Sequence, residues 1–254
     1  MTLPRTPSFR LDGKRALVAG ASSGIGEAAA VALAEAGAHV TLAARRAAKH
    51  AALWHAIEAE GRQANAVTLD VTDIDEAEIV VRHHGPFDIL VNSAGLARHG
   101  PALNADPADY DAVTTLNIRG AYFLTRNVAR GLIDAGKAGS LINISSQMAH
   151  VGGIDRSVYC ATKHAVEGFT KAMAIEWGHH GIRVNTVCPT FIRTALTQST
   201  FENPERRRWI EDKIKLGRVG EVEDIMGPVV FLASDAAALM TGTSILVDGG
   251  WTAD

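Results

Sequence analysis

Seven short, β-rich runs alternate with longer helical stretches along most of this chain, and this alternation limits the possible folds more than any other feature. Several of the runs are apolar on both faces, as strands must be when helices cover both sides of a sheet. Such alternation predicts an α/β fold, a doubly wound parallel sheet of about seven strands with helices on both faces. The runs are residues 15–20, 39–44, 65–71, 87–95, 139–146, 182–189 and 244–250.

The chain is predicted to form one domain, residues 1–254, because no linker, internal repeat or low-complexity tract divides it. Only residues 190–220, after the sixth run, depart from the alternation. In sheets of this kind ligands bind beyond the carboxyl ends of the strands. We therefore expect residues 190–220 to form a mobile lid over a substrate.

Composition excludes several classes of protein. The net charge of -3 leaves no basic surplus for nucleic acid, and no apolar run reaches the ~18 residues of a membrane span. Residues 1–14 lack the apolar core of a signal peptide. With only Cys160 and Cys188, a disulfide framework or a thiolate metal cluster is not expected, and the paired histidines lack metal-ligand spacing. We expect a soluble cytoplasmic protein with a small-molecule substrate, no metal, no nucleic acid and no membrane partner.

A glycine-rich turn follows the first run directly. Gly20, Gly24 and Gly26 are spaced G-x-x-x-G-x-G and precede a helical stretch. Glycines allow the backbone to approach a pyrophosphate closely, and the helix N-terminus offers free N–H groups to phosphate. A plain glycine-rich turn is the alternative, but the position between strand and helix favours dinucleotide binding.

Tyr159 and Lys163 lie four residues apart in a predicted helix, which places them on one face. The pair could be ordinary surface packing. Alternatively, a cation held within ~4–6 Å of a phenol favours the phenolate form. A phenol in that setting can pass a proton to or from a substrate oxygen.

Five motifs, in this order, resemble those of the short-chain dehydrogenase/reductase family: "AGASSGIG", "VNSAG", "TLNIRG", "INISS" and "YCATK". The similarity extends from about residue 12 to the "VDGGW" tail and implies a Rossmann-like fold. Three positions depart from the usual family pattern, namely Ala19, Ser93 and Thr190. None removes a catalytic group, although Thr190 is expected to reshape the loop beside the nicotinamide.

The resemblance implies a catalytic tetrad of Asn117, Ser146, Tyr159 and Lys163. Ser146 would hydrogen-bond the substrate oxygen, and Tyr159 would give or take its proton. Lys163 would favour the phenolate and contact the nicotinamide ribose, and Asn117 would anchor a water that links Lys163 to solvent. Taken singly, Ser146 could simply end a strand, and Asn117 could satisfy backbone groups at a helix kink.

The resemblance also implies an NAD(P) cofactor. The residues expected to bind it are Gly20, Ser22, Ser23, Gly24, Ile25, Gly26, Arg45, Asp70, Val71, Asn92, Ala94, Gly95, Tyr159, Lys163, Pro189, Ile192 and Thr194. A carboxylate at the end of the second strand would favour NAD, but Ala44 stands there and Arg45 follows. An arginine can bind a 2′-phosphate bidentately, which favours NADP. NAD remains the alternative, because similar catabolic enzymes use it and exposed arginine pairs are common.

Basic residues concentrate in the expected lid. They are Arg193, Arg206, Arg207, Arg208, Lys213, Lys215 and Arg218. Arg156 precedes Tyr159 by three residues, and His150 follows Ser146 closely. These cations favour a substrate with a carboxylate, although a solvated helix face would also explain the lid's charge. We expect Ser146, His150, Arg156 and Tyr159 to contact the substrate.

The combined hypothesis is an NAD(P)-dependent oxidoreductase that interconverts a secondary alcohol and a ketone. The segment 145–168 resembles dehydrogenases of sugar acids and related small hydroxy acids, which favours that substrate class. One alternative is a 3-oxoacyl-thioester reductase, and another is a nucleotide-sensing regulator without catalysis. Family resemblance also implies a homotetramer that uses the long helices 107–134 and 157–178.

Overall fold

The computed structural model describes residues 2–253, apart from the side chain of Ser199; residues 1 and 254 of the predicted domain lie outside it. Within the described residues all seven predicted runs form strands of one parallel sheet, ordered β3-β2-β1-β4-β5-β6-β7. The predicted fold class is confirmed. The strands are β1 Arg15–Ala19, β2 His39–Ala44, β3 Ala64–Thr68, β4 Ile89–Asn92, β5 Gly139–Ile144, β6 Ile182–Pro189 and β7 Ser244–Val247.

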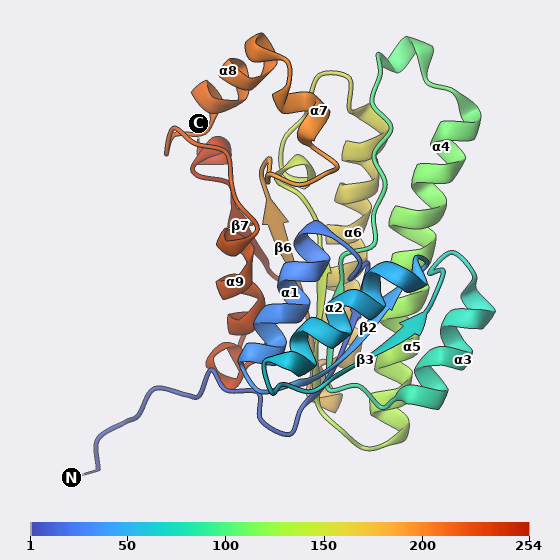
Figure 1. Cartoon of the computed structure of the whole chain (residues 1–254), viewed down its shortest axis with the longest axis vertical. Helices are drawn as coiled ribbons and strands as arrows, with labels where there is room; N and C mark the ends of the chain where they lie inside the picture. The colour runs from blue at the N-terminus through green and yellow to red at the C-terminus, as the bar shows by residue number, and fades with distance from the viewer. Residues whose placement is uncertain (1, 254) are drawn as a thin grey trace.

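Helices cover both faces of the sheet (Figure 1). Helices α1, α2 and α9 pack on one face, and α3, α5 and α6 on the other. In order, the helices are α1 Gly24–Glu35, α2 Ala47–Ala59, α3 Ile74–His84, α4 Pro107–Thr114, α5 Ala121–Asp134, α6 Ser157–Trp177, α7 Gln198–Phe201, α8 Pro204–Lys213 and α9 Glu223–Ala233. No helix in the described part of the chain is both long enough and apolar enough to cross a membrane.

Strand β1 shows why the runs are apolar on both faces. Ala16 and Val18 point into the core under α1 and α9, whereas Leu17 and Ala19 point into the core under α5 and α6. All four are completely buried. The chain runs outward from β1 to β3 and then returns to β4 beside β1. This reversal creates a crevice at the carboxyl ends of β1 and β4, where ligands bind in such folds.

The stretch 107–134 is helical throughout but not α-helical throughout. A π-helical segment, Thr115–Gly120, separates α4 from α5 and carries Asn117. A Cβ at Gly120 would come within 2.8 Å of the Val71 carbonyl oxygen, so the segment passes close to the loop after β3. Such π segments insert an extra residue per turn and often mark functional sites.

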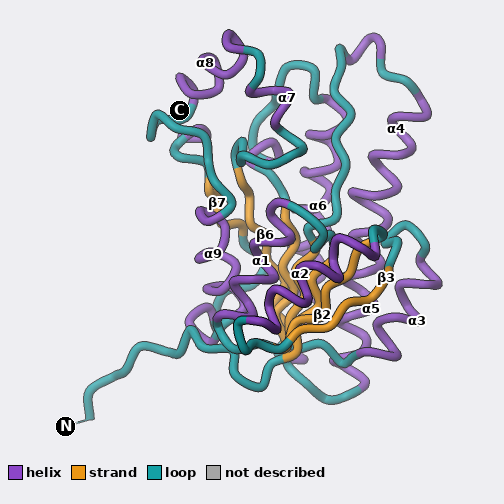
Figure 2. Tube along the Cα trace, in the orientation of Figure 1, coloured by secondary structure: helices purple, strands orange, loops and turns teal. Residues whose placement is uncertain are grey.

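Residues 190–220 stand beyond the carboxyl end of β6 and carry α7 and α8 (Figure 2). Ile210 and Ile214 are buried in a third apolar cluster, with Phe191, Trp251 and Met148 among its members. We call this third apolar cluster the lid cluster. It is separate from the two cores that flank the sheet, and the partly buried Tyr159 ring packs against it.

Candidate active site

A cavity of about 360 Å³ opens at the carboxyl end of the sheet, at the crevice between β1 and β4. Its walls come from the segments that follow strands β1 to β6 and from two side chains of α6. The lining residues that the sequence analysis assigned to cofactor, substrate or catalysis are Gly20, Ser22, Ser23, Gly24, Ile25, Arg45, Asp70, Val71, Ala94, Gly95, Ser146, Tyr159, Lys163, Pro189, Ile192 and Thr194. The fold thus brings most of the predicted site to one cavity.

The glycine loop is shaped to hold a phosphate. Gly20 has a φ of +78°, and a Cβ there would lie 2.8 Å from the Ala94 nitrogen. Ser23 starts α1 without a side-chain cap, so the first N–H groups of this helix are left for a ligand. Gly26 does not line the cavity: a Cβ there would overlap the Gly20 carbonyl oxygen, so this glycine lets α1 approach the loop after β1. The residues present therefore fit a pyrophosphate.

Two arginines flank the same end of the cavity. Arg46 donates from Nη2 to Ser22 Oγ at 2.8 Å and to Ser23 Oγ at 3.1 Å. The Arg45 side chain is mostly exposed, and its Nη1 lies 3.9 Å from Asp70 Oδ2. Sequence reasoning selected Arg45, but Arg46 also lines the cavity and contacts the glycine loop directly. The two adjacent arginines were visible in the sequence, but nothing there indicated which of their side chains points toward the glycine loop.

Three members of the expected tetrad meet on one wall. Lys163 is buried, donates to the Ile144 carbonyl at 2.9 Å and lies 5.6 Å from the centroid of the Tyr159 ring. Ser146, two residues after the end of β5, lines the same cavity, and its Oγ accepts from the Met148 N–H at 3.1 Å. An ammonium has three donors, so Lys163 retains two for other partners.

Asn117 lies behind this wall. Its Oδ1 accepts from the Leu96 N–H, and its Nδ2 donates to the Leu96 carbonyl, both at 2.8 Å; Nδ2 also reaches Thr162. In this arrangement Asn117, in the π-helical segment, satisfies backbone groups of Leu96, much as the alternative raised from sequence expects. It fixes the segment after β4 that lines the cavity. The proposed anchored water stays a prediction.

Asn92 is also absent from the cavity wall. It is 3% exposed, donates from Nδ2 to Asn143 and accepts from the Ala94 N–H. Asn92 therefore holds the loop that carries Ala94 and does not itself face the cavity. Thr190, in contrast, lines the cavity, and its buried hydroxyl has no hydrogen-bond partner among the described residues. This orphaned hydroxyl lies at the end where the sequence analysis placed the nicotinamide.

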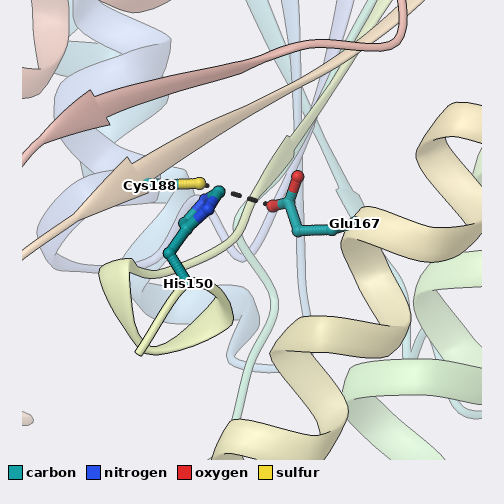
Figure 3. Close-up of side chains that lie close together, drawn as sticks. All are labelled: His150, Glu167 and Cys188. Carbon is teal, nitrogen blue, oxygen red and sulfur yellow. Dashed lines mark hydrogen bonds between the residues drawn. The ribbon is translucent and has the colours of Figure 1, made fainter. Parts of the chain in front are cut away.

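His150 does not line the cavity. Its ring lies beside Glu167 and Cys188, and the potential ligand atoms of the three residues fall within 4.8 Å of one another (Figure 3). Glu167 already accepts hydrogen bonds from Thr186, Ser244 and Cys188. Burial, followed by the nearby Glu167 carboxylate, raises the pKa of the Cys188 thiol to about 12. This is a hydrogen-bonded polar cluster, which sequence spacing gave no means of predicting.

Arg156 lies beside the main cavity rather than on its wall. It is 8% exposed, and its Nη1 donates to His99 Nε2 at 2.5 Å. The guanidinium lies 5.0 Å from the centroid of the Phe191 ring. The His99 ring, in turn, packs edge-on against Tyr159 with centroids 5.9 Å apart. His99 was missed from sequence because it lies in an irregular loop with no motif around it.

Comparison with known proteins shows similarity along nearly the whole chain. Residues 20–252 match a family model described as enoyl-(acyl carrier protein) reductase. The chain is 39% identical to the 2-dehydro-3-deoxy-D-gluconate 5-dehydrogenase of Dickeya dadantii, over 97% of this chain and 98% of that one. It is 40% identical to the L-xylulose reductase of Bos taurus, over 96% and 99%.

A solved structure has the same fold throughout. The gluconate 5-dehydrogenase from Burkholderia cenocepacia, in complex with NADP and tartrate, matches with a TM-score of 0.94. It is 34% identical to this chain, and the match covers 97% of this chain and 98% of that one.

Proposed function

Since the chain belongs to the short-chain dehydrogenase/reductase family, we propose that it is an NAD(P)-dependent oxidoreductase that interconverts a secondary alcohol and a ketone on a small sugar acid. The observation that carries this proposal is the meeting of Ser146, Tyr159 and Lys163 on one wall of a cavity whose other end is a phosphate cradle. A phenol, a hydroxyl and an ammonium gathered there suit proton transfer to an oxygen.

Each residue has a separate task in this proposal. The Ser146 hydroxyl donates a hydrogen bond to the substrate oxygen and orients it toward Tyr159. Tyr159 gives a proton to that oxygen in reduction and takes it in oxidation. Lys163, fixed by the Ile144 carbonyl, stabilises negative charge on the phenol and binds a ribose hydroxyl. The nicotinamide, when bound, supplies or accepts the hydride at the carbon.

The substrate class is supported by relatives named for gluconate and its derivatives, and by the relative whose structure contains tartrate. The test is nucleotide turnover with purified protein. D-Gluconate and other hydroxy acids are offered with NADP⁺ or NAD⁺, and acetoacetyl thioesters with the reduced forms. We expect turnover of a hydroxy acid. Turnover of thioesters alone would favour a 3-oxoacyl-thioester reductase, and nucleotide binding without any turnover would favour a regulator.

We also propose a preference for NADP, with Arg46 and Arg45 as the 2′-phosphate ligands. The support is the absence of a carboxylate at Ala44, which ends β2, and the contact of Arg46 with Ser22 and Ser23. A hydrogen bond to a charged group contributes about 1.5–3 kcal/mol, equivalent to roughly 10- to 100-fold in affinity. Arg46→Ala is therefore expected to weaken NADPH binding by about 10-fold or more and to leave NADH binding nearly unchanged.

Fluorescence titration with both nucleotides at equal salt measures this difference. Lys49→Ala is the matched control, since it removes an exposed positive charge from the first turn of α2, directly after Arg46, at a position that does not line the cavity. An equal loss of NADPH affinity in Lys49→Ala, or an equal loss of NADH affinity in Arg46→Ala, would contradict the phosphate role.

The assembly that we propose is a homotetramer in the cytoplasm. Tyr110 on α4, Tyr122 on α5 and Ile175 on α6 are large apolar side chains with exposed fractions of 51%, 41% and 82%. Exposed apolar side chains on neighbouring helices are typical of subunit interfaces. The two cysteines are free and buried, which suits a reducing compartment.

A further inference from the structure

Arg156 is a buried cation that forms no ion pair with a carboxylate among residues 2–253. Its side chain contacts His99 and Phe191. Burial lowers the pKa of Arg156 and the nearby Arg206 lowers it further, whereas Tyr159, Cys160 and Asp155 oppose this shift without reversing it. A charge removed from water without a counter-ion is unfavourable. A bound anion would provide the missing compensation.

The contacts of Arg156 leave one edge of its guanidinium available. Only Nη1 is engaged, in the bond to His99, so Nε and Nη2 have no hydrogen-bond partner in the described structure. These two groups form the edge of the fork that binds a carboxylate through two parallel hydrogen bonds. The guanidinium also lies over the Phe191 ring, a cation–π contact that uses neither of these two donors in a hydrogen bond.

His99 orients Arg156 without neutralising it. Burial, followed by the charges of Arg156 and Arg206, lowers the pKa of His99 to about 4. The imidazole is therefore neutral near pH 7 and serves as the acceptor for Nη1. The same ring packs edge-on against Tyr159, so His99 contacts both the guanidinium and the proton-transferring phenol.

A second arginine, Arg206, lies close enough to act electrostatically on both residues; it belongs to α8, the helix that stands over the carboxyl end of the sheet (Figure 1). Arg206 influences both His99 and Arg156, and its own guanidinium has no partner among the described residues. Three other lid arginines are paired locally. The pairs are Arg193–Glu221, Arg207–Glu211 and Arg218–Asp224.

We propose that Arg156, oriented by His99, binds the carboxylate of the substrate, and that Arg206 on α8 covers the same carboxylate from the lid side. This inference rests on the proposed function. It places the carboxylate end of the substrate at Arg156 when the reacting carbon lies at Ser146 and Tyr159. His99 is a positioning residue here, since it acts through Arg156. The enzyme would select acids over neutral sugars because only an acid supplies a negative charge that compensates the buried charge of Arg156.

Binding of L-tartrate and threitol to the NADP⁺-loaded enzyme tests the proposal without requiring turnover. The two molecules share one four-carbon skeleton and differ in their ends, carboxylates in one and CH₂OH groups in the other. Calorimetric titration is expected to show at least about 10-fold tighter binding of tartrate, the size of a charge-assisted hydrogen bond. Arg156→Met should remove this preference and change threitol affinity by less than about 3-fold.

A second variant protects the test against misfolding of Arg156→Met. His99→Asp keeps the arginine but gives it an internal carboxylate, which competes with the ligand. Tartrate binding should fall by about 10-fold or more, threitol binding should persist, and thermal stability should be retained. Arg206→Met should weaken tartrate binding by a smaller factor, about 3-fold. Arg207→Met, with the same change of charge on the same helix but a local Glu211 partner, is the matched control.

The possible outcomes separate this inference from the proposed function. Equal binding of tartrate and threitol by the unmodified enzyme, or an equal loss of tartrate affinity in Arg207→Met, would overturn the carboxylate subsite even if polyols are oxidised. A tartrate preference that is lost in Arg156→Met and His99→Asp would support the subsite. If that loss occurred in an enzyme that turns over no hydroxy compound, the subsite would stand and the proposed function would fail.

Discussion

Replacing Tyr159 with phenylalanine is expected to lower kcat by about 10³-fold, while the affinity for NADPH changes by less than about 3-fold. The variant keeps the ring that packs against His99 and the lid cluster and loses only the phenolic oxygen. General acid–base catalysis contributes roughly 10²- to 10⁴-fold to a rate, and Ser146 cannot replace the phenol because an aliphatic hydroxyl is a much weaker acid than a phenol. Single-turnover measurement of nucleotide oxidation gives the chemical step directly.

Tyr110→Phe provides the matched control for that experiment. Tyr110 lies on α4, is half exposed and does not line the main cavity. Its substitution should leave both kcat and nucleotide affinity unchanged. If Tyr159→Phe retained more than about one tenth of kcat, the proton-transfer role of Tyr159 would have to be abandoned.

Gly26→Ala is expected to weaken NADPH binding by roughly 10²-fold. The added Cβ overlaps the Gly20 carbonyl, which is backbone and cannot rotate away, so α1 must shift from the loop after β1. That shift separates the helix N-terminus from the pyrophosphate, and loss of two charge-assisted hydrogen bonds gives about the stated factor. Overpacking should also reduce the free energy of unfolding by about 1–3 kcal/mol. Nucleotide titration and denaturant unfolding measure the two effects.

Gly131→Ala, in α5, is the control that distinguishes the effect of close packing at Gly26 from a general effect of replacing a helical glycine. A Cβ at Gly131 meets nothing within 4 Å, and alanine is the better helix former. This variant should bind NADPH normally and be as stable as the unmodified protein, or slightly more so. Normal NADPH affinity in Gly26→Ala would show that the close approach of α1 is not needed for binding.

Much of the fold is encoded locally, which explains why sequence reasoning recovers it. Each strand is a short β-rich run between turn residues, and β1 is recognisable because both of its faces are apolar. The predicted helix 107–134 is helical throughout, but its Thr115–Gly120 segment is π-helical. Asn117 and Gly120 of this segment lie close to the loops after β4 and β3, contacts that helical periodicity does not register.

The candidate site divides in the same way. Ser146, Tyr159 and Lys163 carry a recognisable order and spacing, and the fold brings them together as expected. The orientation of a flexible side chain depends on contacts that are distant in the sequence, so the sequence around the residue does not predict it. Arg46, rather than Arg45, reaches the glycine loop because of the backbone geometry where β2 passes into α2. His99 reaches Arg156 across 57 residues of chain, and no motif announces the contact.

The lid cluster has a consequence for how this molecule could acquire new specificities. Because Ile210, Ile214 and Trp251 pack apart from the two cores of the sheet, the stability of α8 depends on a small local set of contacts. Segments held in this way open at a much lower free energy than the whole domain. Substitutions in the lid can alter which molecules are admitted while the sheet and the glycine loop keep their own stability. Specificity and cofactor binding can therefore diverge independently in evolution.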